Sequence, residues 1–185
     1  MLKYNFRYNV FNVLKDSFLI NEMVDLFIEE FSNYPFFEKF SKIEINGYLN
    51  NILGYSNGTI IYATHAKNLV GFACGYPVKY EPNIRKVIEK YINPTDCFYN
   101  SQLVVYKKFR DQGVGRNLVV RRINYAQELK FKRVVVRVSQ NVPSVIHLYE
   151  TMGFIKLKDT QLVSRLRISG KQDIDERYFY YKNIF

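Results

Sequence analysis

The chain has little cysteine and no long apolar segment. Only two cysteines occur among its 185 residues, which is too few for a disulfide framework or a structural zinc site. No apolar run approaches the ~18 residues that a membrane-spanning helix needs. Residues 1–7 interleave charged and aromatic side chains and lack the apolar core of a signal peptide. These absences predict a cytoplasmic protein with no metal site and no membrane segment.

Positive charge is in excess, and it is unevenly distributed. The net charge is +10, and residues 107–137 carry ten Lys and Arg against only Asp111 and Glu128. Such a basic segment can attract a phosphorylated cofactor or RNA. We favour a basic rim that attracts the cofactor and keeps the protein soluble, because runs of charge are usually solvated faces. Nucleic acid stays open as the less favoured partner.

The length and the composition favour one domain of mixed α and β structure. A chain of this size with 48% hydrophobic residues can bury a substantial core. Period-two and helical hydrophobic patterns alternate along it without an internal repeat, a low-complexity segment or a linker. We therefore expect a single domain over residues 1–185.

The patterns predict an order of elements and several of their ends. Strands are expected at 4–8, 59–66, 69–80, before 106, at 133–138, 154–165 and 176–183, and helices after 17, at 41–53, 82–92, after 115 and at 143–151. Asp16 or Ser17 is the expected cap of the first helix. Ser41 and Glu44 have the spacing of a capping box. A short hairpin turn is expected at 67–68.

The most informative segment runs from Gln102 to Leu118. A β-branched strand ends in the basic turn Arg110-x-x-Gly113-x-Gly115, and an amphipathic helix follows directly. Glycines let backbone N–H groups approach an anion, and a helix N-terminus supplies unpaired donors and partial positive charge. The segment lacks the spacing of a P-loop and the third glycine of the dinucleotide fingerprint. It therefore predicts a phosphate site of another kind.

A second motif follows the strand expected at 133–138. Asn141 can cap the next helix, Pro143 suits its first turn, and Gly153 lies where that helix should end. The strands on either side of the phosphate loop and its helix should be joined by a right-handed crossover. We therefore expect these two strands to be parallel neighbours.

Taken together, the two motifs resemble those of the GNAT superfamily of acyl-CoA-dependent N-acyltransferases. In that family a strand ending L-x-V precedes [Q/R]-x-x-G-x-[G/A], and an asparagine, a small residue, a tyrosine and a Gly-Phe pair follow later. Here these positions are Leu103, Val105, Arg110, Gly113 and Gly115, and then Asn141, Ser144, Tyr149, Gly153 and Phe154. The resemblance is strong over residues 98–157 and weaker on both sides.

The resemblance implies a fold and an activity. The fold would be α+β in three layers, with a mixed, mostly antiparallel sheet, a central parallel strand pair and helices on both faces. The activity would be transfer of an acetyl group from acetyl-CoA, the co-substrate, to a primary amine by direct attack in a ternary complex. A small-molecule or peptide-like acceptor is expected, in an aromatic, nearly neutral cleft built from the first two helices, residues 76–94 and the late strands.

The resemblance also assigns binding roles. Backbone N–H groups of residues 112–117 would hold the pyrophosphate, with Arg110 or Arg116 adding charge-assisted contacts. Main chain near Leu103 and Val105 would bind the pantetheine arm, and one N–H there would stabilise a developing oxyanion. The expected cofactor-binding residues are Leu103, Val104, Val105, Arg110, Asp111, Gln112, Gly113, Val114, Gly115, Arg116, Asn117, Asn141 and Tyr149.

Tyr149 is the one catalytic residue that the resemblance names. It would protonate the departing thiolate as a general acid, and the alternative is a tyrosine that only packs its helix. Asn141 would bind the pantetheine arm, cap its helix, or do both. Many relatives have a general base early on the strand before the loop, but residues 98–102 hold no carboxylate. Candidates elsewhere are Asp96, Glu81, His65 and a chain of waters, and we name no base.

Two other functions stay open on the sequence. One is a GNAT-type toxin that acetylates the amine of an aminoacyl-tRNA, for which the basic residues 107–137 would bind RNA. The other is a module that binds acyl-CoA or nucleic acid without turnover. The identity of the acceptor, the acyl-chain preference and a homodimeric assembly are likewise open.

Overall fold

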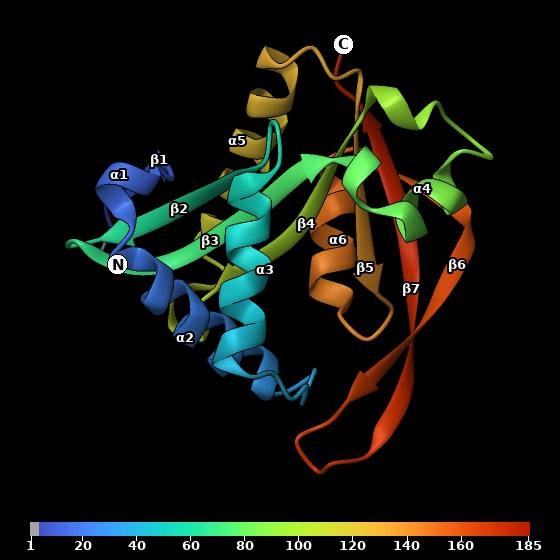
Figure 1. The fold of residues 1–185 in the computed structure, drawn as a ribbon. Coiled ribbons are helices and arrows are strands. Elements are labelled where there is room, and N and C mark those ends of the chain that lie inside the picture. Colours follow the sequence, from blue (N-terminus) through green and yellow to red (C-terminus); the bar gives the residue numbers. More distant parts are fainter. Residues whose placement is uncertain (1–3) are drawn as a thin grey trace.

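The computed structural model describes residues 4–185, and residues 1–3 of the N-terminal segment discussed above lie outside it. Seven strands form one sheet in the order β1-β2-β3-β4-β5-β7-β6 (Figure 1). β4 and β5 are parallel, and the other neighbouring pairs are antiparallel. This confirms the mixed sheet with a parallel pair. The strands are β1 (Phe6–Val10), β2 (Thr59–His65), β3 (Asn68–Pro77), β4 (Cys97–Val105), β5 (Arg133–Ser139), β6 (Ile155–Leu166) and β7 (Gln172–Asn183).

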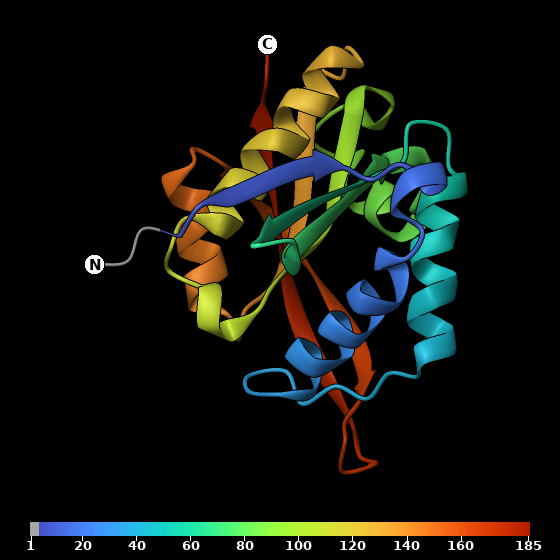
Figure 2. The ribbon, with the colours of Figure 1, turned by 90° about the vertical axis from the view of Figure 1, so that its left-hand side faces the viewer.

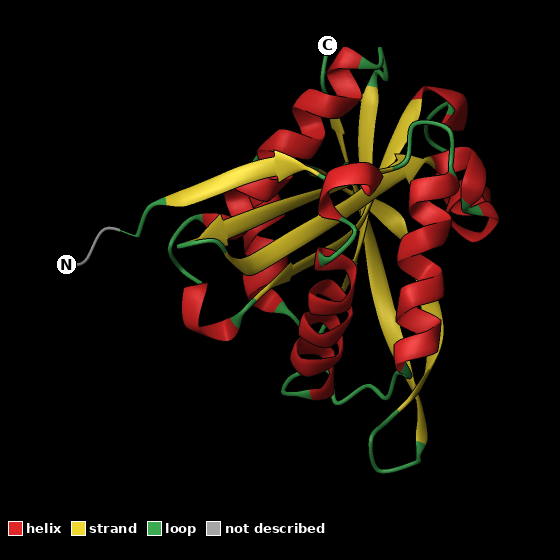
Figure 3. Ribbon diagram, turned by 60° about the vertical axis from the view of Figure 1, so that its left-hand side comes forward, coloured by secondary structure: helices red, strands yellow, loops and turns green. Residues whose placement is uncertain are grey.

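Helices cover both faces of the sheet, as expected (Figure 3). α2 and α3 pack on one face, and α5 and α6 pack on the other, so α3 and α5 lie on opposite sides of the strands in Figure 2. None of the helices within residues 4–185 is long and apolar enough to cross a membrane. The helices are α1 (Val13–Asp16), α2 (Leu19–Ser32), α3 (Lys42–Gly54), α4 (Pro82–Ile88), α5 (Val114–Glu128) and α6 (Pro143–Thr151).

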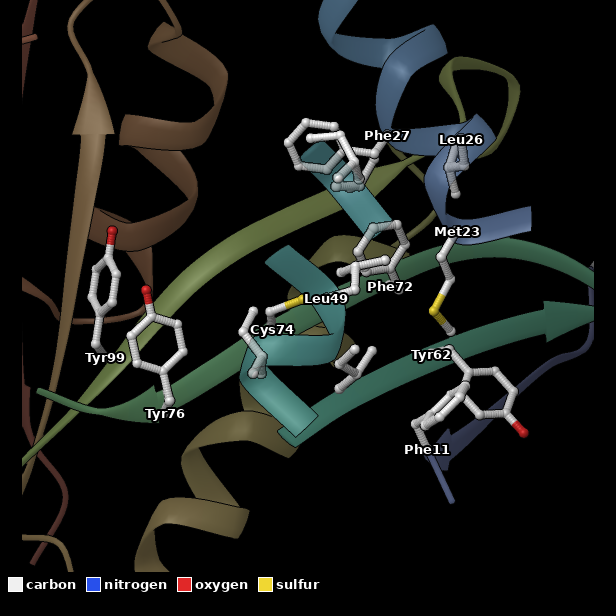
Figure 4. Close-up of a cluster of buried hydrophobic side chains, with 14 of the residues drawn as sticks. Phe11, Met23, Leu26, Phe27, Leu49, Tyr62, Phe72, Cys74, Tyr76 and Tyr99 are labelled. Atoms are coloured by element: carbon white, nitrogen blue, oxygen red, sulfur yellow. The ribbon is translucent and has the colours of Figure 1, made fainter. Parts of the chain in front are cut away.

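The larger core cluster fills the space between α2, α3 and the sheet (Figure 4). Met23 and Phe27 of α2 are four residues apart and therefore share one helix face. They meet Leu49 of α3 and Phe72 of β3, and all four side chains are buried. Each contributes on the order of 1.5–3 kcal/mol relative to an exposed side chain. This cluster fixes α2 and α3 against β3 and β4.

The start of the first long helix differs from the prediction. α2 begins at Leu19 and no side chain caps it, so the prediction that Asp16 or Ser17 is its cap is wrong. Asn12 caps the short helix α1 instead, and its side chain accepts from the Leu14 N–H at 3.0 Å. The Asp16 carboxylate accepts from the Asn12 N–H at 2.8 Å, so it is already engaged before α2 begins.

The predicted start of α3 is confirmed, and the predicted β2–β3 turn is displaced by one residue. The capping box of Ser41 and Glu44 is confirmed at the start of α3. The β2–β3 turn lies at Ala66 and Lys67, one residue earlier than predicted, because His65 pairs with Asn68. Both turn residues have positive φ, 48° and 69°. Two-residue hairpin turns of type I′ require this of both central positions.

The parallel strands β4 and β5 separate halfway along their length. Their pairing ends at Asn100 and Val136, although both strands continue. At the same level β4 carries a bulge, because its residues Ser101 and Gln102 lie opposite the single residue Cys74 of β3. A bulge bends a strand and interrupts its ladder. It therefore helps to turn β4 away from β5 and to open a gap in the middle of the sheet.

Candidate active site

A first cleft of about 570 Å³ lies beside this gap. Its walls come from the end of α2 and residues 34–36 after it, β4, the loop that follows β4, the start of α5, and α6. Nine of the predicted cofactor-binding residues line it, and they are Leu103, Val104, Val105, Arg110, Asp111, Gly113, Gly115, Arg116 and Asn141. The structure therefore brings most of the predicted cofactor set together in one concave site.

Four predicted cofactor residues lie outside the walls of this cleft. Val114 is buried in the core beneath it. The Gln112 side chain donates to the Lys108 carbonyl at 3.1 Å, and the Asn117 side chain donates to the Gly113 carbonyl at 3.0 Å. For these three residues only the backbone N–H was predicted to bind. The fourth, Tyr149, lines a neighbouring cleft.

The start of α5 leaves backbone donors without a side-chain cap. Gly113 precedes the helix with φ +80°, and Asp111 has φ +59°. The first N–H groups of an α-helix have no acceptor within the helix, and no side chain caps those of α5. A Cβ at Gly115 would make an ordinary contact with Leu103 Cδ2 at 3.8 Å, so a larger side chain would extend among the side chains of the cleft. Unpaired donors and the positive helix end therefore meet the cleft.

The two arginines predicted to contact pyrophosphate have different partners. Arg110 forms an ion pair with the buried Glu30 of α2 and donates from Nε to the Val105 carbonyl at 3.2 Å. Arg116 donates from Nη2 to the Thr151 hydroxyl at 2.8 Å, and it has no carboxylate partner within the described chain. Arg116 is therefore the better placed of the two to pair with an anion.

A second cleft, of about 530 Å³, adjoins the first. Phe31, Phe36, Leu103, Val142 and Val145 line both clefts, so the two meet across β4 and the start of α6. Its other walls come from α3, β5, β6 and β7. The first two long helices and the late strands thus line it as predicted, whereas residues 76–94 do not.

Tyr149 lines the second cleft only, and it lies one turn of α6 after Val145, which lines both clefts. Its side chain is only 2% exposed, and its ring packs edge-on against Phe154 at 5.0 Å between centroids. Its hydroxyl oxygen accepts a hydrogen bond from Arg122 Nη2 at 3.3 Å. Burial and this single donor fix the phenol at the edge of the cleft.

Arg122 was not predicted as a site residue. This α5 residue is 0% exposed, and its Nη1 donates to the carbonyls of Cys74 and Gln102, each at 2.8 Å. Those carbonyls belong to the β3–β4 bulge, where the ladder is interrupted, and buried carbonyls need donors. A signal was present, because Arg122 lies on the apolar face of its helix, four residues from both Leu118 and Ala126.

Asn141 does not cap α6. The cap position is Val142, and no side chain bonds to the start of the helix, so the predicted capping role is wrong. The Asn141 Nδ2 donates instead to the Asp175 carboxylate of β7 at 3.0 Å. A hydrogen bond to an ionised carboxylate is stronger than one between neutral groups, which favours this contact over a cap at the start of α6. Asn141 still lines the first cleft.

The candidate bases from the sequence lie elsewhere. Asp96, Glu81 and His65 line neither cleft. Asp96 is paired with Lys132 at 3.4 Å, and Glu81 accepts from the Tyr76 hydroxyl at 3.1 Å. Two carboxylates that line the second cleft, Glu38 and Glu44, are bound by Arg165 and by the capping box. Among residues 4–185, no group of three His, Cys, Asp or Glu side chains is arranged to hold a metal ion.

Sequence comparison gives one family match. The model of the acetyltransferase (GNAT) family matches residues 19–154, a range that includes the phosphate loop, the bulge and Tyr149. No curated protein matches the chain.

Many solved structures share the fold. A ribosomal-protein-alanine N-acetyltransferase from Brucella melitensis is 15% identical, with 96% of this chain and 99% of that chain covered and a TM-score of 0.71. An N-acetyltransferase from Staphylococcus aureus Mu50 is 14% identical, with 98% and 99% covered and a TM-score of 0.70. A Salmonella typhimurium structure with its cofactor acetyl-CoA is 11% identical, with 97% and 94% covered and a TM-score of 0.67.

Proposed function

The chain belongs to the acetyltransferase (GNAT) family, and from this premise we propose that it transfers an acetyl group from acetyl-CoA to the nitrogen of a primary amine. One observation carries the proposal. Two clefts meet beside the gap between β4 and β5, and Tyr149 lines the second of them, one helical turn after Val145, which lines both. One cleft suits a phosphorylated thioester donor, and the other has room for an acceptor.

Acetyl-CoA fits the first cleft in two respects. The uncapped N–H groups at the start of α5, together with Arg116 and Arg110, suit the pyrophosphate. Beyond Asn100, β4 has lost its β5 partner, so main chain at Leu103 and Val105 can bond the extended pantetheine arm as an added strand would. The Salmonella typhimurium structure holds acetyl-CoA on the same fold, which supports this placement.

We assign the cofactor-binding role to the predicted set. Backbone of 112–117 would contact the pyrophosphate, and Asn141 would bond the arm from the opposite wall, since it lines the same cleft. When bound, acetyl-CoA supplies a thioester whose acetyl carbon accepts a nucleophile. The remaining chemistry is that of the acceptor and of this chain's own residues.

Tyr149 would act as the general acid. The neutral amine forms a C–N bond to the acetyl carbon while the C–S bond breaks, and the sulfur takes the bonding electron pair. The Tyr149 hydroxyl gives its proton to that sulfur, and Arg122 Nη2 keeps a hydrogen bond to the phenol oxygen. The proton lost from nitrogen leaves through water, because the second cleft opens to solvent at the exposed residues Lys39 and Glu44. Tyr149 then regains a proton from solvent.

We further propose that residues 1–185 act as one domain. The support is that a single sheet takes strands from Phe6 near the start of the chain to Asn183 near its end. A non-catalytic binding module would keep this fold but fail the turnover test below.

The internal pairing of basic residues favours a small acceptor over RNA. In the basic segment 107–137, Arg110 pairs with Glu30, Lys132 pairs with Asp96, and Arg122 is buried. Less of the positive charge is therefore available to bind RNA than the sequence suggests. An RNA surface with several phosphate contacts would lose ~10³ or more in affinity between 50 and 200 mM salt. Fluorescence anisotropy of tRNA binding across that salt range, together with assays of acetyl transfer to aminoacyl-tRNA, tests this alternative.

The proposal is tested by release of coenzyme A thiol from acetyl-CoA with a panel of amines, namely amino acids, polyamines and short peptides. Thiol release that requires an amine, with the acetyl group found on its nitrogen by mass spectrometry, is the expected result. Absence of amine-dependent release with the whole panel and with aminoacyl-tRNA would contradict the enzyme assignment.

A further inference from the structure

The second cleft carries more positive than negative charge in its walls. Arg137 of β5, Arg165 of β6 and Arg177 of β7 all line it. Arg137 and Arg177 lie on the same sheet face, because Arg137 pairs with Phe179 and strand residues two apart share a face. A nearly neutral cleft was predicted here. These three arginines correct that expectation.

The carboxylates of Glu38 and Asp175 are already bonded to other side chains. Arg165 is almost fully buried and is bonded to both Glu38 and Asp175. Arg177 donates from Nε to Asp175 as well, at 3.0 Å. Asp175 also accepts from the Ser139 hydroxyl at 2.6 Å and, as described, from Asn141. Two carboxylates thus serve two arginines and two neutral donors, and neither is bonded to Arg137.

Arg137 has only a neutral partner within the described residues. Its Nη1 donates to the side-chain carbonyl of Gln161 at 2.7 Å, and its Nε is buried without a hydrogen-bond partner. A buried cationic donor without a partner is costly and calls for an acceptor. The positive charge of Arg137 also acts on Arg177. The pKa of Arg177 is lowered, first by burial and next by the positive charge of Arg137. An anion between Arg137 and Arg177 would give Arg137 Nε an acceptor and would reduce the repulsion between the two guanidinium groups.

We propose that the acceptor amine also carries a carboxylate, and that Arg137 together with Arg177 binds this carboxylate in the second cleft. This inference rests on the proposed acetyl transfer. The amine end would lie at the junction with the first cleft, near Tyr149, and the carboxylate would lie toward β5 and β7. A planar guanidinium suits a carboxylate because it can donate two parallel hydrogen bonds.

The phosphates of the donor do not account for this charge. Neither Arg137 nor Arg177 lines the first cleft, where the uncapped start of α5 and Arg116 lie. The two sets of cations therefore lie on different sides of the junction. One set faces the donor, and the other faces the acceptor.

Matched acceptors test the proposal directly. An amino acid that the enzyme acetylates is compared with its carboxamide and with the amine left after decarboxylation. The intact enzyme should prefer the acid by at least about tenfold in kcat/KM, which is the effect of one hydrogen bond to a charged group. Arg137→Gln should lose that preference mainly through KM for the acid. Arg137→Lys, which keeps the charge but not the planar fork, should recover part of it.

Arg133→Gln is the matched control. Arg133 lies on the same strand, bonds to Asn183 and pairs with Asp96, and lines neither cleft. It should keep the preference for the acid, and melting curves of all variants identify any that misfold. If Arg137→Gln misfolds, Arg137→Lys alone carries the comparison.

The outcomes separate this inference from the proposed function. Equal kcat/KM for the acid and its amide in the intact enzyme would overturn the inference and leave acetyl transfer standing. Absence of transfer to any amine would overturn the proposed function. In that case, calorimetric titration of each amino acid of the panel into protein saturated with coenzyme A decides the site. Binding that is lost in Arg137→Gln and kept in Arg133→Gln supports it, and equal or absent binding contradicts it.

Discussion

Arg122 Nη2 lies 3.3 Å from the hydroxyl oxygen of Tyr149, so a fully buried cation donates directly to the proposed general acid. The same guanidinium holds the carbonyls of Cys74 and Gln102 at the β4 bulge. The bulge that opens the gap and the phenol that lies beside the gap are therefore held by one side chain. Their relative position depends on Arg122.

Arg122→Gln should lower both stability and kcat. It removes the donor from two buried carbonyls, each of which costs about 1–3 kcal/mol when left unpaired. At ~2–4 °C per kcal/mol for a chain of this size, Tm should fall by at least about 4 °C. Arg121→Gln is the control, because Arg121, which is next to Arg122 in the chain, is exposed and stacks on Tyr8 at 4.7 Å. Equal Tm and kcat for the Arg122 variant and the parent would refute the linking role.

Tyr149→Phe should bind acetyl-CoA almost as well as the parent but turn over on the order of 10² times more slowly, because it lacks the acid proton. Tyr180→Phe is the matched control. Tyr180 is as deeply buried, and its hydroxyl bonds to Glu150 at 3.3 Å, outside both clefts. Single-turnover rates give the comparison. If both variants keep the parental rate, Tyr149 only packs its helix.

Gly115→Val should abolish stabilisation by acetyl-CoA. A Cβ at Gly115 is accommodated, but larger branches would extend among the cleft side chains Leu103, Val105 and Leu148. For the parent, ligand at ~100 times Kd should add about 2.7 kcal/mol to the free energy of unfolding. Gly47→Val is the control, because Gly47 is exposed on α3 with open space around it. Equal ligand-induced Tm shifts in parent and Gly115→Val would contradict the loop assignment.

The two cysteines should be unreactive in the folded protein. Burial raises the pKa of both the Cys74 thiol and the Cys97 thiol to about 12, so only about one thiol in 10⁴ is ionised at pH 8. Iodoacetamide at pH 8 should therefore label them only after unfolding. Rapid labelling of the native protein would contradict their burial.

The same shift has a consequence for stability. The unfolded thiol ionises near pH 9.0 and the folded thiol near 12, so the folded state holds more protons between these values. The free energy of unfolding should then fall as pH rises from about 9 to 12. Cys97→Ala should reduce that slope, as urea unfolding at pH 8, 10 and 11 would measure. A slope identical to that of the parent would contradict the assignment to Cys97.

The sequence predicts those parts of the site that depend on neighbours along the chain. Gly113, Gly115 and the helix after them predict an anion site through local backbone chemistry, and the structure has both glycines in one cleft with Asn141. The Asn12 cap was missed because the short turn of α1 has no hydrophobic period that would reveal it. The turn at Ala66 was misplaced by one residue, since neither Ala nor Lys signals positive φ.

The features that the sequence could not predict depend on contacts between strands. The bulge opposite Cys74 follows from the β3–β4 register, and only that register shows why an arginine is buried on α5. Arg137, Arg165 and Arg177 lie on three different strands and meet in one cleft only through sheet packing. A count of charge along the chain assigned Arg137 to the cofactor side, whereas the structure has it in the wall of the second cleft.

Initial rates measured while acetyl-CoA and an amine acceptor are both varied test the central claim most directly. Direct attack in a ternary complex predicts intersecting double-reciprocal lines, an N-acetylated product, and no acetylated protein by intact mass when acetyl-CoA is supplied alone. Parallel lines together with an acetyl-enzyme would indicate a covalent, two-step route. That result, or an absence of any amine-dependent thiol release, would contradict the account.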